Sequence, residues 1–541
     1  MQPKKESVRF LMRNITLPYT AAESDALQSA SDILKKMCGA RPEVLHVVRR
    51  SVDARHAPRV MFVYTVLADL DVGATEVARA LSHRDISLYA EPVLPLAYGN
   101  EPLSGRPVIA GFGPCGMFCA MILAENGYRP VILERGGDIE DRVTSVRRFY
   151  ETRLLDPDCS VQFGAGGAGT FSDGKLLTRV NDPLCAYVLR RLVDFGAPKD
   201  ILIHAKPHVG TDKLCAVVQN IEKYLRERGC TFRYRTRLDD FSSDGSSVTC
   251  KTGKEDIPCG ALVLATGHSA RDTYRMLMRR GLKVEPKPFS VGVRIEHLQT
   301  DIDRALYAEA AGDPRLPPAE YTLSAHVGGI GVYSFCMCPG GEVVAAASEP
   351  GGVVTNGMSC HARNGPNANA ALAVSVRPAD YGGTPEGAMR FQRRLEEAAF
   401  RAGGRDYSAP CESVGSFLDN DSENSKARVE PSYWGGRVRM CRLSSVLPPY
   451  VTATLAAGIR RFDRKLPGFA IPDALLTGVE TRTSAPLRIV RDTESGVSPT
   501  QSLVYPCGEG AGYAGGITSA AVDGIRCALR IMKRFCPLDH E

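Results

Sequence analysis

The strongest pattern in the chain lies between residues 107 and 136, where two short apolar runs flank a glycine-rich turn and an uncharged stretch of helical length. The first run, Val108–Ala110, leads into Gly-Phe-Gly-Pro-Cys-Gly at residues 111–116, and the second run ends at Glu134. Strand, G-x-G-x-x-G turn, helix, strand and acid in this order form the dinucleotide-binding fingerprint. The pattern therefore predicts an α/β domain of Rossmann type, with a parallel sheet.

Each position of this fingerprint has a physical reason. Gly111 allows the tight turn, Gly113 lets backbone N–H groups approach a pyrophosphate, and Gly116 lets the helix pack close to the sheet. The N-terminus of the helix carries a partial positive charge that favours phosphates. Glu134 is placed to accept hydrogen bonds from the ribose hydroxyls of an adenosine. The glycines and Pro114 in the uncharged stretch argue against its spanning a membrane.

Two later strands are expected to end in turns that return to the same ligand. An apolar run over residues 257–266 ends in Ala-Thr and is followed by Gly, and another ends at Pro506, before Gly508, Glu509 and a last helix. An acid at this last turn can bond a polyol chain, and the helix N-terminus can face a pyrimidine carbonyl. NAD has neither a ribityl chain nor a flavin ring, so the last turn favours FAD. The glycine-dense segment 160–175 is expected to pack its backbone against the same ligand.

Together these turns predict one FAD site. The cofactor-binding residues are expected to be Gly111, Gly113, Pro114, Cys115, Gly116, Glu134, Arg135, Gly166, Gly167, Gly169, Thr170, Lys175, Leu238, Thr266, Gly267, Gly508, Glu509, Gly516 and Ile517. No second G-x-G-x-x-G follows a strand. NAD(P)H is therefore expected to dock only transiently, as an electron donor to the flavin.

The remaining patterns divide the chain into predicted domains. In residues 1–100, strand and helix patterns alternate as β-α-β-β-α, which favours a small α+β unit of ferredoxin-like type, with the polar segment 49–56 between two of its strands. Residues 101–288 and 479–541 are expected to form the two parts of the FAD-binding domain. Residues 289–478 are rich in strand patterns and are expected to be an inserted substrate or cap domain.

Long motifs over nearly the whole chain extend this interpretation, among them VQFGAGGAGTFSDGKL, KPHVGTDKL, ATGHSARDTY, YSFCMCPGGEVV and GEGAGYAGGITSAAVDG. With them the chain resembles the uncharacterised FAD-dependent dehydrogenases, a bacterial-type family of the two-dinucleotide-binding-domain flavoprotein class. The resemblance implies FAD at the fingerprint and at Gly508 and Glu509, and it implies no established substrate. Two residues that abut the expected site depart from the family pattern: Ala165, where Glu is expected, and Cys115, where Ala is usual.

Candidate catalytic residues are few. Cys336 and Cys338 stand two apart in a strand pattern, which predicts that they share one face. They are candidates for a thiol relay or a metal site, and the alternative is that both are small buried side chains. His361 and Arg363 are candidate substrate-side groups. Lys175 is a candidate donor to flavin N5 or to a substrate anion, and a phosphate or surface role fits it equally well.

The composition limits the class of protein, its redox state and its metal content. The chain has 541 residues, of which 44% are hydrophobic and 24% charged, as in ordinary folded proteins with several domains. Its 17 cysteines are odd in number and scattered, which favours reduced thiols in a cytoplasmic protein. No apolar stretch of signal-peptide length stands at the N-terminus, and an organelle-targeting peptide stays open. The histidines show no ligand spacing supported by other residues, so no metal is expected.

The sequence thus predicts an FAD-dependent oxidoreductase, a dehydrogenase or reductase that transfers hydride between flavin and an unidentified small substrate. The net charge of +6 and a basic cluster in the N-terminal unit leave an alternative, a flavin-containing RNA-binding or RNA-modifying factor. The cluster consists of Arg49, Arg50, Arg55 and Arg59. A docking or capping role is the other interpretation of this unit, and a redox-inert, FAD-stabilised interaction protein is a third hypothesis. No membrane partner is expected, and the oligomeric state stays open.

Overall fold

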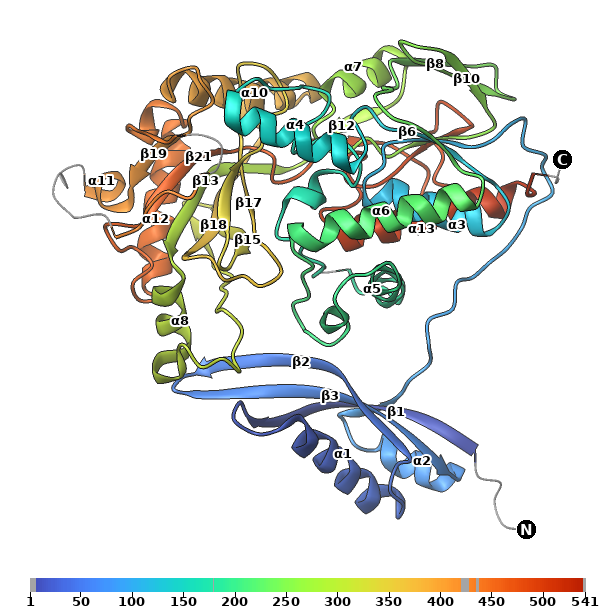
Figure 1. Ribbon diagram of the computed structural model, residues 1–541, viewed down its shortest axis with the longest axis vertical. Helices are drawn as coiled ribbons and strands as arrows, with labels where there is room; N and C mark the ends of the chain where they lie inside the picture. Colours follow the sequence, from blue (N-terminus) through green and yellow to red (C-terminus); the bar gives the residue numbers. More distant parts are fainter. Residues whose placement is uncertain (1–5, 179, 420–427, 434–436, 539–541) are drawn as a thin grey trace.

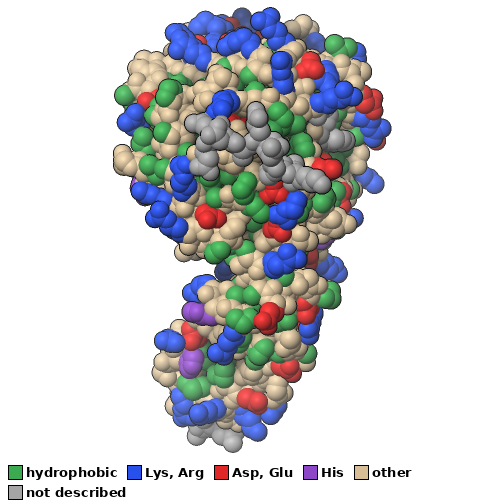
Figure 2. Space-filling view, turned by 90° about the vertical axis from the view of Figure 1, so that its left-hand side faces the viewer, with side chains coloured by type: hydrophobic (Ala, Val, Ile, Leu, Met, Phe, Trp, Pro, Cys, Tyr) green, Lys and Arg blue, Asp and Glu red, His purple; other side chains and the backbone are tan. Residues whose placement is uncertain are grey.

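The computed structural model describes residues 6–178, 180–419, 428–433 and 437–538. Figure 1 shows a large body and, below it, a smaller unit formed by the start of the chain. The same small unit is the narrower lower lobe in Figure 2. The protein is mixed α/β, with one wholly parallel sheet and others that are mainly antiparallel.

The small N-terminal unit has the element order β-α-β-β-α-β. Its antiparallel sheet has the strand order β2-β3-β1-β4, and both helices cover one face of it (Figure 1). Alternate residues of β3, from Val60 to Val72, are buried, as expected for a strand with one packed face. The elements are β1 (Glu6–Pro18), α1 (Glu23–Cys38), β2 (Val44–His56), β3 (Arg59–Val72), α2 (Ala74–Leu81) and β4 (Ile86–Leu88).

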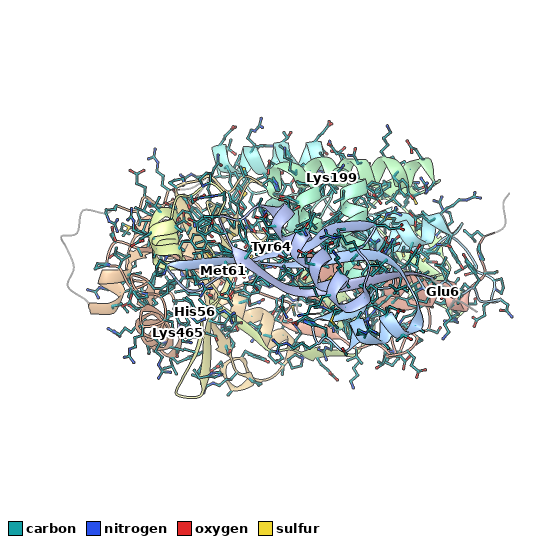
Figure 3. All side chains as sticks on the ribbon, turned by 90° about the horizontal axis from the view of Figure 1, so that it is seen from below. Glu6, His56, Met61, Tyr64, Lys199 and Lys465 are labelled. Carbon is teal, nitrogen blue, oxygen red and sulfur yellow. The ribbon has the colours of Figure 1, made fainter. Side chains whose placement is uncertain are left out.

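Strand β2 differs from expectation because it runs through the polar segment 49–56 without a break. Its pairing with β3 shifts register twice, between Val47 and Arg49 and again near His56, so bulges accommodate the polar residues within the ladder. The outer edge of β2 contacts the large body: the Arg50 N–H donates to the Ile203 carbonyl (2.7 Å). From below, the sheet crosses under the large body (Figure 3).

The parallel sheet lies in the large body and has the strand order β23-β11-β5-β6-β7. Helix α3 packs against α13 so closely that a Cβ on Gly524 would lie 2.1 Å from the Cys115 carbonyl oxygen. Helix α6 contacts the other side of α3 (Figure 1). The elements are β5 (Val108–Ala110), α3 (Pro114–Glu125), β6 (Val131–Leu133), α6 (Thr211–Glu227), β7 (Thr231–Arg233), β11 (Leu262–Leu264), β23 (Val504–Pro506) and α13 (Ile517–Arg534).

The single strand expected over residues 257–266 is wrong, because the structure has two strands there in different sheets. Strand β10 (Asp256–Cys259) belongs to a three-stranded sheet with β8 (Asp240–Ser243) and β9 (Val248–Lys251), and β11 belongs to the parallel sheet. Between them the chain passes over the backbone of Gly105, where a Cβ on Gly260 would lie 2.7 Å from the Gly105 oxygen. Because of this close contact, β10 ends before β11 begins.

A seven-stranded sheet of order β14-β15-β18-β13-β21-β19-β20 forms the other half of the large body. Helix α12 covers β14, β15 and β18 (Figure 1). Its strands are β13 (Phe289–Leu298), β14 (Ser324–Val327), β15 (Ile330–Cys338), β18 (Asn367–Val376), β19 (Pro410–Ser413), β20 (Arg439–Met440) and β21 (Leu475–Glu480). The division of the chain into the domains given above stays a prediction.

Shorter sheets and helices complete the large body. The sheets are β12 (Val284–Pro286) with β22 (Leu487–Ile489), and β16 (Glu342–Ala345) with β17 (Thr355–Met358). The other helices are α4 (Ile139–Thr152), α5 (Leu184–Asp194), α7 (Arg271–Arg279), α8 (Gln299–Tyr307), α9 (Pro378–Tyr381), α10 (Pro385–Ala402), α11 (Val414–Asp419) and α12 (Pro449–Asp463). Within the described ranges, no helix has both the length and the apolar character to cross a bilayer.

Candidate functional site

A cavity of about 400 Å³ lies where β5, β6, β11 and β23 reach their carboxyl ends. Its other wall comes from the seven-stranded sheet, chiefly from residues 334–337 of β15. Ligands of open α/β sheets bind outside the carboxyl ends of the strands. The position of the cavity therefore makes it the candidate ligand site.

Most of the predicted cofactor residues line this cavity. They are Gly111, Gly113, Pro114, Cys115, Glu134, Arg135, Gly167, Gly169, Lys175, Leu238, Thr266, Gly267, Glu509, Gly516 and Ile517. The fold thus brings together residues from turns that are far apart in the sequence. Their individual roles in binding stay predictions.

The other predicted cofactor residues lie behind the cavity wall: Gly116, Gly166, Thr170 and Gly508. A Cβ on Gly116 would lie 1.9 Å from the Gly111 oxygen, and a Cβ on Gly508 would lie 2.8 Å from the Cβ of Cys115. Both glycines let α3 lie directly against the strand ends. The close packing shapes the turn, and the predicted contacts of these residues with the cofactor stay predictions.

Arg142 of α4, which the sequence analysis missed, holds the glycine-rich segment in place. The fully buried guanidinium donates to five backbone carbonyls of residues 160–167, the shortest bonds being to Ala165 (2.6 Å) and Gly167 (2.8 Å). The Gly166 N–H donates to the Phe112 carbonyl (2.8 Å), which ties the segment to the fingerprint turn. Ala165 is fully buried and does not line the cavity, contrary to expectation. The segment is thus a fixed wall.

Glu134 joins the fingerprint turn to the glycine-rich segment. Its carboxylate accepts backbone N–H bonds from Phe112 (2.9 Å), Gly136 (2.9 Å) and Gly164 (3.0 Å). An ionised carboxylate offers about four acceptor positions, so one stays for a ligand hydroxyl. The side chain lines the cavity, and the predicted contact with ribose is compatible with this geometry.

Glu509 and His268 face each other across the part of the cavity near the end of β23, with 3.9 Å between carboxylate oxygen and imidazole Nε2. Burial raises the pKa of Glu509 to about 7. Burial, together with the charges of Arg482 and Arg271, lowers the pKa of His268 to about 3. His268 is therefore neutral at physiological pH, whereas Glu509 can hold or release a proton there.

We predict that Glu509 makes the FAD-free protein less stable as the pH rises from about 4.5 to about 7. An acid with a raised pKa binds its proton more tightly in the folded state, so the free energy of unfolding falls by up to about 1.4 kcal/mol per pH unit in that window. Glu509→Gln should remove this slope in urea unfolding. The exposed variant Glu494→Gln is the control, and an identical pH profile for wild type and Glu509→Gln would contradict the prediction.

The candidate catalytic residues separate in the structure. Cys336 and Lys175 line the cavity, whereas Cys338 is fully buried behind it. The expected regular strand is wrong here, because β15 shifts register between Phe335 and Cys338, so the alternation of faces is broken. His361 does not line the cavity; it stacks on His208 with 5.1 Å between ring centroids.

Comparison with known proteins bears on this site. Residues 288–483 match the family model "FAD-dependent protein, C-terminal domain-like". The chain is 43% identical over 510 residues to an uncharacterised protein of Clostridium beijerinckii, covering 93% of this chain and 95% of the relative. The chain belongs to the same family as this relative, and it carries a domain of FAD-dependent proteins. FAD is accordingly its cofactor.

Solved structures similar to this chain are distant. Glycine oxidase from Geobacillus kaustophilus is 12% identical, with 80% of this chain and 96% of that chain covered and a TM-score of 0.36. CtdE in complex with FAD is 10% identical, with 80% and 87% covered and a TM-score of 0.32. At these scores the similarity carries no inference about the reaction. Among the described residues, no group of three or more His, Cys, Asp and Glu side chains is placed to hold a metal ion.

The lining of the cavity is compatible with an anionic cofactor such as FAD. Gly267, Gly515 and Gly516 face open space, since a Cβ on any of them would meet nothing within 4 Å. Arg482, which the sequence analysis missed, lines the cavity and is 8% exposed. Its Nε and Nη2 donate to Glu396 (2.8 and 3.1 Å), while Nη1 is buried with no partner among the residues that the structure describes. A buried N–H without a partner is unfavourable, so this N–H is placed to donate to an acceptor oxygen of a bound cofactor.

We predict that Arg482→Gln weakens FAD binding about 10- to 100-fold, because a hydrogen bond to a charged group contributes about 1.5–3 kcal/mol. Glu396 keeps Arg271 as a partner (2.8 Å), so the fold survives the change. Quenching of FAD fluorescence on titration into FAD-free protein measures the affinity. Arg279→Gln, an exposed change on α7, is the control. Equal FAD affinity for Arg482→Gln and wild type would refute the assignment.

Proposed function

We propose that the protein is an FAD-dependent oxidoreductase that transfers hydride between the flavin and a small molecule held against β15. The observation that carries this proposal is the shared cavity: the predicted FAD turns form one wall and β15 forms the other. Bound FAD supplies two-electron chemistry. The protein's part is to position the substrate and exclude water.

Residues near the β15 wall of the cavity can position the substrate and exclude water. Lys175 and Lys206 both pair with Glu320, at 3.4 and 3.1 Å. Glu320 neutralises one of the two lysines, so the three groups offer directed hydrogen bonds to a substrate with one positive charge remaining. Phe335 and Leu177 border the same cavity and are 37% and 58% exposed, so they give it an apolar rim. Glu509, with its pKa of about 7, can exchange a proton with a substrate at neutral pH.

Anaerobic mixing of the FAD-loaded protein with NADH or NADPH tests the proposal. We expect one of the two to bleach the flavin absorbance, and a carbonyl or other two-electron acceptor to restore it. Reduction by dithionite is the control that the flavin is accessible to electrons. If dithionite reduces the flavin but neither nicotinamide nor any cellular metabolite fraction does, the redox-inert hypothesis replaces this proposal.

The RNA-binding alternative stays a second proposal with less support. Of the basic cluster, Arg50 lies 3.2 Å from His204 of the large body and Arg55 pairs with Asp53 (2.6 Å). On the face in Figure 2, Lys and Arg side chains are dispersed over both lobes and alternate with acidic ones. Filter binding of RNA at increasing salt tests this alternative, since phosphate contacts weaken steeply with ionic strength.

A further inference from the structure

Strand β15 is interrupted at the point where it forms the cavity wall. Phe335 pairs with Ala371 and Cys338 pairs with Asn369, so three steps along β15 match two along β18. One residue is therefore extra, which is the definition of a β-bulge. Cys336 takes up the distortion, with a φ of 44°, a region that non-glycine residues seldom adopt.

Two cations hold the carbonyls that the bulge removes from the ladder. Arg294 donates to the Cys336 carbonyl (2.9 Å), and Lys175 donates to the Met337 carbonyl. Arg294 is fully buried and is fixed by a bidentate pair with Glu480, both bonds being 2.9 Å. Arg294 and Lys175 thus stabilise the bulge through its two carbonyls, and their positive charges lie near the thiol of Cys336.

The pKa values of the two cysteines in the bulge are shifted in opposite directions. The hydrogen bond with Cys338, and the charges of Arg294 and Lys175, lower the pKa of Cys336 below that of an ordinary thiol, against the effect of burial. The same hydrogen bond and burial raise the pKa of Cys338. The thiol on the cavity wall is thus the more acidic of the two, and the thiol behind it is the less acidic. The charged groups that face this pair are Lys175, Arg294, Asp173 and Glu509.

Two residues at this spacing on a strand lie within the range of a disulfide. In a regular strand, alternate residues lie about 6.6–6.8 Å apart, at the upper limit of Cα separations in disulfides, about 6.8 Å. The Cys338 thiol already lies 3.4 Å from the Cys336 carbonyl oxygen.

We propose that Cys336 and Cys338 form a redox-active dithiol that reduces small disulfides in the FAD cavity, with Cys336 as the nucleophile and Cys338 as the resolving thiol. This inference rests on the proposed function and names its substrate class. It adds the C-x-C pair of Cys336 and Cys338 on the cavity wall to the path that electrons take.

The reaction balances as a two-electron exchange. The Cys336 thiolate attacks one sulfur of R–S–S–R, whose S–S bond breaks and releases RS⁻. The Cys338 thiol loses its proton to that leaving group and attacks the Cys336 sulfur, which forms the Cys336–Cys338 disulfide and releases a second RS⁻, protonated from solvent. Two electrons and two protons restore the dithiol. FAD, when bound and reduced, would supply these electrons, and a nicotinamide nucleotide would reduce the FAD.

In the test, the FAD-loaded protein is first reduced by a phosphine, and the phosphine is then removed. The reduced protein is mixed with bis(2-hydroxyethyl) disulfide under argon. After acid quenching and alkylation in denaturant, we expect the wild-type peptide that carries both cysteines to be unalkylated and two hydrogens lighter. Cys338→Ser should instead trap a mixed disulfide of mercaptoethanol on Cys336, and Cys336→Ser should form neither product. Cys185→Ser on α5 is the matched control and should behave as wild type.

An electron count separates this inference from the proposed function. Dithionite titration of the disulfide-treated protein should consume two electrons per FAD more than titration of Cys336→Ser or Cys338→Ser. A reducible FAD with no extra electrons and no Cys336–Cys338 disulfide would overturn the inference alone. The opposite outcome is also distinguishable. If no nicotinamide or metabolite reduces the FAD but the cysteines still form the disulfide, the proposed function is wrong and the inference about the thiol pair is kept.

Discussion

Replacing Gly111 by alanine should yield a protein that is purified without FAD. Gly111 has a φ of 108°, and a Cβ there would lie 2.3 Å from the Ala265 oxygen and 2.8 Å from the Ala265 carbon. Both atoms are backbone of the segment after β11, so neither can rotate away. The strained φ costs about 1–3 kcal/mol and the overpacking about as much again. Since the distortion falls on the cavity wall, FAD affinity should drop roughly 30-fold or more.

Calorimetric titration of FAD into the refolded variant measures this loss. Gly39→Ala is the matched control, because Gly39 also has a positive φ (78°), yet a Cβ there would meet nothing within 4 Å. It ends α1 in the N-terminal unit, far from the cavity along the chain, and its substitution should lower stability slightly and leave FAD affinity unchanged. A Gly111→Ala protein that binds FAD as tightly as wild type would show that the turn does not form the cofactor wall.

The fingerprint turn was predictable because its requirements are local. Gly111, Gly113 and Glu134 stand within one β-α-β stretch, and backbone geometry alone fixes what each must be. The later turn at Glu509 was predictable for the same reason, since a strand, an acid and a helix start follow one another in sequence. These residues line one cavity, so local patterns identified turns that the fold brings together.

The bulge of β15 was not predictable from its own residues. Alternation along a strand places Cys336 and Cys338 on one face, and nothing in the motif Phe-Cys-Met-Cys signals an extra residue. The groups that support the bulge are distant: Arg294 is 42 residues from Cys336, and Lys175 is 162 residues from Met337. Only the folded chain brings these cations to the two freed carbonyls, so the sequence analysis regarded the pair as a regular strand.

Arg142 and Arg482 were missed for a related reason. Arginine is mostly exposed, and a sequence offers no sign that a particular one is buried. Arg142 is buried because the glycine-rich segment presents its carbonyls, and Arg482 because Glu396, 86 residues away, accepts two of its bonds. Both residues become candidates only when their partners are known. In this protein the buried arginines, more than the glycines, distinguish the site from a generic dinucleotide fold.

Arg294→Met should therefore have the second large effect, on stability and on thiol reactivity together. Arg294 is fully buried and also donates to Asn356 (2.8 Å), and its removal leaves the buried carboxylate of Glu480 without its cation. Breaking such a pair costs about 3–5 kcal/mol, which urea unfolding of the FAD-free protein will show as a lower midpoint. The exposed control Arg279→Met should stay within about 0.5 kcal/mol of wild type.

The double variant Arg294→Met with Glu480→Leu separates charge from packing. Replacing both partners of a buried ion pair by apolar groups is often close to neutral, so the double variant should regain most of the stability that Arg294→Met loses. It should not regain the reactivity of Cys336, because the thiol still lacks the positive charge and its carbonyl still lacks the donor. The rate of Cys336 alkylation by iodoacetamide at pH 7 measures this. Alkylation as fast as in wild type, in either variant, would mean that Arg294 supports the fold without activating the thiol.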